Sequence, residues 1–72
     1  MATREERCVK RLIQVATRPK TELEEKNQEV ALWSLKSNAQ QHNKVLAICK
    51  AELKRDPSSR KLLSVVEEAR RR

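Results

Sequence analysis

The sequence predicts an all-α protein, a small bundle of three to four helices that ends in an antiparallel C-terminal helix hairpin. Gly is absent from all 72 residues, and tight β-hairpin turns depend on Gly. Most residues are Leu, Ala, Lys, Arg, Glu or Gln, which are good helix formers. Near the C-terminus, apolar residues follow the i, i+3, i+4, i+7 spacing of helices that bury one face. We expect residues 1–72 to form a single small helical domain, either a whole protein or the N-terminal module of a longer one.

The first helix is predicted to span Arg4–Thr17. Thr3, followed three residues later by Glu6, is a capping-box pattern, in which each side chain bonds a free amide of the first turn. The residue before a proline disfavours helical backbone, so Pro19 is predicted to end the helix. The stripe that we expect to be buried consists of Cys8, Val9, Leu12, Ile13 and Ala16.

The second helix is predicted to begin after Thr21, because Thr21 and Glu24 repeat the capping-box pattern. Its later part, Val30–Leu35, is apolar nearly all round, which is typical of a helix that lies centrally or presents one face to a partner. A break or kink is expected near Ser37, because the apolar stripe changes phase there. One continuous helix over residues 22–55 is the alternative.

The third and fourth helices, predicted over Asn38–Arg55 and Pro57–Arg71, form the hairpin. Asp56 as N-cap, with Pro57 at the first helical position, indicates where the fourth helix begins. The short connection predicts that the two helices are antiparallel neighbours. The stripes expected to be buried are Ala39, His42, Val45, Leu46, Cys49 and Leu53 on the third helix, and Leu62, Val65, Val66 and Ala69 on the fourth, with Leu63 at its edge.

The stretch Leu53-Lys54-Arg55-Asp56-Pro57, followed by Leu62-Leu63 and Ala69, resembles the junction between successive tetratricopeptide repeats. The chain departs from that pattern at Glu52, where a small Ala is usual, and it has no second copy at the repeat length of 34 residues. We therefore interpret the stretch as a general helix-hairpin signal.

The potentially reactive side chains are predicted to be structural. His42 is the only histidine, and no Cys or carboxylate lies near it at metal-ligand spacing. Cys49 lies two helical turns further on, roughly 10 Å away, which is too far for a Cys–His catalytic pair. Cys8 and Cys49 are expected to be small buried hydrophobes in a reducing compartment. With no acid/base pair, metal cluster or phosphate loop in the sequence, we expect a non-enzymatic protein without a cofactor.

The charge of the chain favours acidic partners. The formal net charge is +7 at pH 7, which suits nucleic acid or an acidic protein segment. The sequence contains no apolar run long enough for a signal peptide or a membrane span, so we expect no membrane association and a nuclear or cytoplasmic location.

The predicted function is that of an interaction module, an adaptor whose groove between helices binds an acidic and apolar segment of a partner protein. Binding of nucleic acid is the alternative, because arginines at positions 4, 7, 11 and 18 fall within about 60° on a helix. A homo-oligomer formed through Val30–Leu35 is a third hypothesis. Trp33 is a candidate anchor in the core or at the partner. The residues predicted to bind the partner are Arg7, Arg11, Trp33, Lys44, Lys50 and Lys54.

Two serines are candidates for regulation. Ser58 and Ser59 fall in the first turn of the predicted fourth helix, just before two basic residues. A phosphate there would be stabilised by the helix dipole and by the neighbouring basic side chains. The alternative is that both are ordinary first-turn serines.

Overall fold

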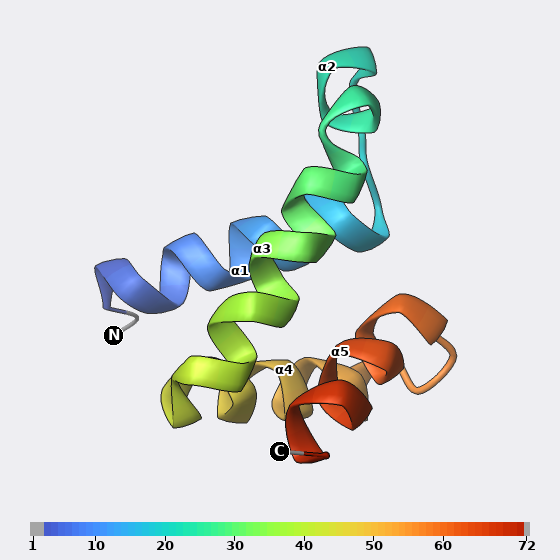
Figure 1. Ribbon diagram of the computed structural model, residues 1–72. Coiled ribbons are helices and arrows are strands. Elements are labelled where there is room, and N and C mark those ends of the chain that lie inside the picture. The colour runs from blue at the N-terminus through green and yellow to red at the C-terminus, as the bar shows by residue number, and fades with distance from the viewer. Residues whose placement is uncertain (1–2, 72) are drawn as a thin grey trace.

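The computed structural model describes residues 3–71, and every regular element among them is a helix. The all-α prediction is therefore confirmed. Helix α3 contacts each of the other helices and runs through the middle of the molecule (Figure 1). The elements are α1 (Arg4–Thr17), α2 (Glu22–Lys26), α3 (Gln28–Gln41), α4 (Asn43–Arg55) and α5 (Arg60–Arg70).

Helix α1 has the predicted bounds and the predicted N-cap. The Thr3 hydroxyl oxygen accepts a hydrogen bond from the Glu6 N–H at 3.2 Å. Beyond the helix, Arg18 leaves the helical region ahead of the proline, with φ −140° and ψ 66°. The prediction that Cys8 is buried is wrong, because its side chain is exposed. It lies about 100° around the helix from the buried Val9, on a side that the neighbouring helices leave uncovered.

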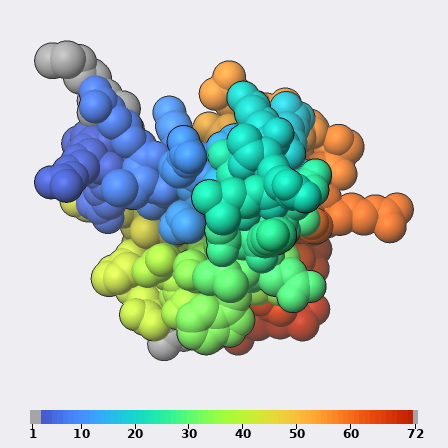
Figure 2. Space-filling model, turned by 90° about the horizontal axis from the view of Figure 1, so that it is seen from above, coloured from blue at the N-terminus to red at the C-terminus, as the bar shows by residue number. Residues whose placement is uncertain are grey.

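The second predicted helix divides at Asn27. Helix α2 is a short segment capped by Thr21, whose hydroxyl oxygen accepts from the Glu24 N–H at 3.1 Å. At Asn27 the backbone has φ −96° and ψ 3°, and the Asn27 side-chain amide donates to the Leu23 carbonyl at 2.9 Å. Such competition from an Asn side chain interrupts regular helix geometry. Helix α2 contributes no buried residue, and it covers the upper end of the molecule, as seen from above in Figure 2.

The predicted break near Ser37 is wrong, and so is the alternative of one helix over residues 22–55. Helix α3 passes through Ser37 and ends at Gln41, and His42 is extended, with φ −130° and ψ 117°. Ala39 and Val45 are both buried, yet on one continuous helix they would point about 120° apart. The extended residue at His42 lets both face one core.

The start of the last helix differs from the prediction by a few residues. Asp56 does not cap α5, because its carboxylate accepts hydrogen bonds from the Arg18 guanidinium at 2.6 Å and from the Ser58 hydroxyl at 2.8 Å. Pro57 and Ser58 form a turn, and Ser59 is the N-cap. The Ser59 hydroxyl oxygen accepts from the Leu62 N–H at 3.4 Å. Helix α5 packs against α4, α3 and α1.

The core lies where α1, α3, α4 and α5 meet. The buried stripe of α5 is the predicted one, with Leu63 41% exposed at its edge. Cys49 is buried as expected, whereas the prediction that His42 joins the core is wrong, because His42 is exposed at the junction of α3 and α4. The main buried cluster consists of Val9, Ile13, Leu35, Ala39, Val45, Cys49, Leu62, Val65, Val66 and Ala69.

Candidate functional site

A groove of about 500 Å³ lies between α4 and α5. Its α4 wall is one face of that helix, because residues 50, 53 and 54 follow the i, i+3, i+4 spacing. Pro57, in the turn after α4, continues this wall. Its α5 wall comes from two residues one turn apart. Hereafter the α4–α5 groove means this hollow and its lining residues, which are Lys50, Leu53, Lys54, Pro57, Val66 and Arg70.

The α4–α5 groove combines an apolar floor with a basic rim. Val66 is buried and Leu53 is half-buried. The rim is formed by Lys50, Lys54 and Arg70, which are exposed. Among residues 3–71, no acidic residue lines the groove, and none of the three basic side chains forms an ion pair. Like charges around an apolar floor produce a positive potential that favours a negatively charged occupant.

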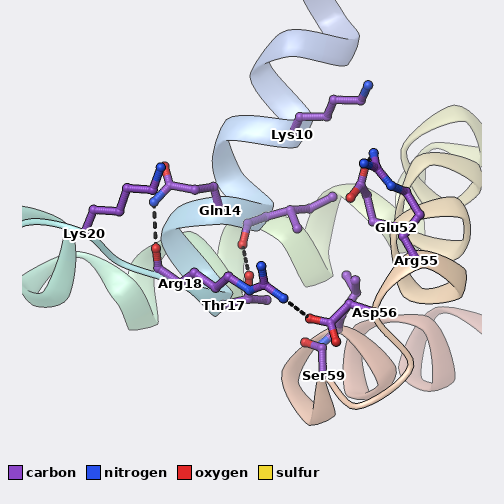
Figure 3. Close-up of a pocket in the computed structure, with 11 residues that line it drawn as sticks. Lys10, Gln14, Thr17, Arg18, Lys20, Glu52, Arg55, Asp56 and Ser59 are labelled. Atoms are coloured by element: carbon purple, nitrogen blue, oxygen red, sulfur yellow. Dashed lines mark hydrogen bonds and ion pairs between the residues drawn. The ribbon is translucent and has the colours of Figure 1, made fainter.

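A second, polar hollow of about 420 Å³ lies where the end of α1, the end of α4 and the start of α5 meet (Figure 3). The Arg18 side chain reaches towards Asp56, whereas Lys10, Lys20 and Arg55 lie apart around the hollow. Glu52 lies 3.6 Å from Arg55. The Glu52 and Asp56 carboxylates therefore partly neutralise the basic side chains that line the hollow. The hydrogen bonds from Ser58 and Arg18 hold the pKa of the Asp56 carboxyl below its usual range. The side chains that line this hollow therefore hold together the end of α1, the end of α4 and the start of α5.

A further polar cluster fixes the loop between α1 and α2. The Glu24 carboxylate accepts hydrogen bonds from the Lys20 N–H at 2.9 Å and from the Gln14 side-chain amide at 2.8 Å. Arg11 lies 3.5 Å from the other oxygen of the same carboxylate. The Lys20 and Gln14 hydrogen bonds, with Arg11 nearby, hold the pKa of Glu24 below its usual range. Arg11 is thus partly neutralised within the molecule.

The predicted binding residues fall on separate surfaces. Lys50 and Lys54 lie together in the α4–α5 groove. Lys44 is exposed at the start of α4 but does not line the groove. Arg7 and Arg11 are exposed on α1. The sequence interpretation did not include Arg70 in this site, although its spacing from Val66 is that of one helical face.

Trp33 is 71% exposed on α3, so it is not a core anchor. Val30, one turn earlier on the same helix, is 62% exposed. Ala31 and Leu35 are buried within the chain's own fold. Within the apolar Val30–Leu35 segment, the side chains on the surface are therefore chiefly those of Val30 and Trp33.

Cys49 is buried in the core and is not a ready nucleophile. Burial raises the pKa of the Cys49 thiol to about 11, with a smaller contribution from the nearby Glu52 carboxylate. The thiol is therefore protonated at neutral pH, and only a thiolate is strongly nucleophilic. Among residues 3–71, no group of three or more His, Cys, Asp or Glu residues could hold a metal ion.

The comparisons with known proteins identify no relative. No family model matches the chain, and searches of curated proteins and of solved structures find no match. Among the described residues, no helix combines the length and the apolar character that crossing a bilayer requires. The geometry and charge of the α4–α5 groove are therefore the observations from which a function can be argued.

Proposed function

We propose that the protein is a non-enzymatic α-helical interaction module whose α4–α5 groove binds an amphipathic segment of a partner protein. The occupant carries apolar residues that enter the groove and acidic residues that face its rim. One observation carries the proposal. Three basic side chains that form no ion pair with a described residue surround an apolar floor, and no carboxylate of residues 3–71 lines the groove.

The arrangement suits a helix or short segment that lies along two antiparallel helices. In such complexes, apolar anchors at i and i+4 fill the groove and the flanking charges set orientation. Acidic residues near Lys50, Lys54 and Arg70 would speed association and select against basic competitors. An antiparallel α4–α5 hairpin, as the short connection suggests, would keep the two walls parallel over the length of the occupant.

The groove is small, so we expect a transient complex. A hollow of about 500 Å³ accepts only a few side chains. Interfaces of this limited extent give affinities in the range of roughly 1–100 μM. Because the rim residues are exposed, affinity should fall as salt is raised, although the apolar contacts remain.

An amide-shift titration tests the proposal. Isotope-labelled protein would be titrated with a synthetic helical peptide that carries Leu at i and i+4 and Glu on the flanking positions. Shifts should be concentrated on residues 50–57 and 66–70. The same peptide with Lys in place of every Glu should bind at least roughly tenfold more weakly.

Matched variants separate the groove from general attraction to a basic protein. Lys50→Glu and Lys54→Glu reverse charges on the groove rim, whereas Lys44→Glu makes the same change on α4 outside it. Only the first two should abolish binding of the acidic peptide. Equal losses in all three variants, or shifts spread over the whole surface, would rule out the groove as the binding site.

Nucleic-acid binding through α1 is the second candidate. The observation in its favour is that Arg4, Arg7 and Lys10 are exposed without an ion pair to a described residue. In Figure 2 the N-terminal part of α1 projects to one side of the molecule. Arg18 leaves the predicted stripe because it binds Asp56, and Arg11 is partly neutralised by Glu24.

A salt titration distinguishes the two candidates. Binding to phosphates should weaken linearly on a log–log plot, with a slope of roughly −0.9 for each phosphate neutralised in duplex DNA. Arg7→Glu should then reduce binding, and Lys54→Glu should leave it nearly unchanged. If short duplex and single-stranded probes produce no shifts on α1 at low salt, this candidate is eliminated.

A further inference from the structure

We infer that Ser58 is a phosphorylation site for a serine kinase that selects basic residues before the serine, and that the phosphate weakens binding of an acidic partner in the α4–α5 groove. The second half of this inference rests on the proposed function. It uses the turn between α4 and α5, which adjoins the groove at Pro57.

Ser58 and Ser59, which the sequence alone does not distinguish as phosphate acceptors, differ in exposure and hydrogen bonding in the structure. Ser58 is exposed in the turn, outside any helix, and its hydroxyl donates to Asp56 at 2.8 Å. Ser59 is half-buried, and its hydroxyl oxygen caps α5 by accepting from the Leu62 N–H. A kinase can reach the first hydroxyl by opening a short turn, whereas reaching the second requires uncapping a helix. Ser58 is therefore the acceptor.

The residues around Ser58 have the charge pattern that such a kinase reads. Lys54 and Arg55 precede it by four and three residues, and Arg60 and Lys61 follow. Kinases of this class present carboxylates that pair with basic side chains on the N-terminal side of the serine, and Arg pairs with a carboxylate in two parallel hydrogen bonds. The Arg55 side chain is 77% exposed, and its one ion pair among the described residues, with Glu52 at 3.6 Å, is a surface pair. Such pairs are weak, so a kinase carboxylate can displace Glu52.

The reaction is a phosphoryl transfer from ATP with its magnesium ion. The Ser58 Oγ forms a bond to the γ-phosphorus of ATP, the bond from that phosphorus to the β,γ-bridging oxygen breaks, and ADP leaves. The hydroxyl proton passes to the carboxylate base of the kinase. The products are phosphoserine at position 58 and ADP.

The phosphate would change the charge at the edge of the groove. It carries about −1.5 to −2 charge at pH 7, and Ser58 directly follows the groove residue Pro57. The phosphate would thus lower the positive potential of the groove at the end that Pro57 forms. Phosphorylation also removes the Ser58 hydroxyl hydrogen, which is donated to the Asp56 carboxylate. The phosphate then competes with Asp56 for the Arg18 guanidinium. An acidic partner would be repelled.

The modification is tested first by itself. The full chain is incubated with ATP, magnesium and an arginine-directed serine kinase, and fragment masses locate the phosphate. Ser59→Ala should be modified as fast as the parent, Ser58→Ala should not be modified, and Arg55→Ala should slow the reaction roughly tenfold. Phosphate on Ser59 instead, or no incorporation, would overturn the assignment.

The effect on binding is tested with chemically defined protein. Cys49 permits ligation of a synthetic segment, residues 49–72, that carries phosphoserine at 58 only. Relative to the same ligated chain without phosphate, the affinity for the acidic peptide should fall roughly tenfold at physiological salt and recover after phosphatase treatment. An unchanged affinity would refute the regulatory role.

The two proposals fail in different ways. If the unmodified chain does not bind the acidic peptide, the proposed function fails and the regulatory role fails with it. The mass measurement of phosphate at Ser58 is independent of that peptide. If the peptide binds and the kinase leaves Ser58 unmodified, only the further inference is lost.

Discussion

Arg18 Nη2 lies 2.6 Å from Asp56 Oδ2, so an ion pair joins the residue after α1 to the residue after α4. The two residues are 38 positions apart in the chain. This contact positions the turn that precedes α5, because the same carboxylate also accepts the Ser58 hydroxyl. Its arginine side chain is 72% exposed, so salt should weaken the pair.

The first prediction concerns acid. The pKa values of Asp56 and Glu24 are lowered in the folded protein, so an unfolded chain binds protons more readily than the folded one. The stability that these carboxylates contribute is present above their unfolded pKa values, about 4, and is lost as pH falls through the lower folded values. Urea midpoints should therefore decrease below about pH 5. Asp56→Asn should make this decrease in the urea midpoint smaller.

Glu67→Gln is the control, because Glu67 is exposed and forms no ion pair among the described residues. The urea midpoints of this variant should depend on pH as those of the parent do.

The second prediction compares two neighbours on α3. Leu35 is fully buried, whereas Trp33 is 71% exposed. Leu35→Ala should lower the free energy of unfolding by roughly 2–5 kcal/mol, which is most of the stability of a domain this small. Trp33→Ala should change it by less than about 0.5 kcal/mol. Circular dichroism during urea titration measures both, and comparable losses would contradict the observed packing of α3.

The third prediction tests where α5 begins. Ser59 caps the helix, so Ser59→Ala should lower the free energy of unfolding by about 1 kcal/mol. Ser58→Ala removes an exposed hydroxyl and should have a smaller effect. The comparison uses urea unfolding at neutral pH. Equally small effects of both substitutions would indicate that the helix begins earlier, as the Asp-Pro pattern predicts.

The fourth prediction concerns the two thiols. Cys8 is exposed and should react rapidly with an alkylating reagent, whereas Cys49 is buried and should react only when the protein opens. Because the Cys49 pKa rises from 9.0 to about 11 on folding, the unfolded chain loses this proton first as pH rises. Stability should therefore decline between about pH 9 and 11. Cys49→Ala should remove this decline, although it also lowers stability at neutral pH. Intact mass against time follows the alkylation, and equal rates at both thiols would be inconsistent with a buried Cys49.

Local signals in the sequence predicted the elements that depend on local chemistry. Thr3 and Thr21 cap helices as their spacing from Glu6 and Glu24 indicates. The stripe of α5 is buried as its periodicity predicts. In these cases the neighbouring residues supply the hydrogen bonds or the apolar face, so tertiary contacts only reinforce the pattern.

The sequence predictions are wrong where contacts between residues far apart in the chain determine the local geometry. Asp56 has the sequence context of an N-cap, but Arg18, far away in the chain, and Ser58 occupy its carboxylate. The break at His42 has no capping side chain. It arises because Ala39 and Val45 must both face a core built partly from α1 and α5. Of the candidate site, spacing alone indicates that Lys50 and Lys54 share a face, but the packing of α5 on α4 is needed to add Arg70.

The exposure of Trp33 determines how this protein can be observed. The chain contains no Tyr or Phe and no other Trp, so its intrinsic fluorescence comes from one indole that water already reaches. Emission should therefore be nearly as red-shifted in the folded state as in the unfolded state, and acrylamide should quench both. Unfolding must be followed by backbone signals, whereas a blue shift on adding a partner would report contact with the outer face of α3.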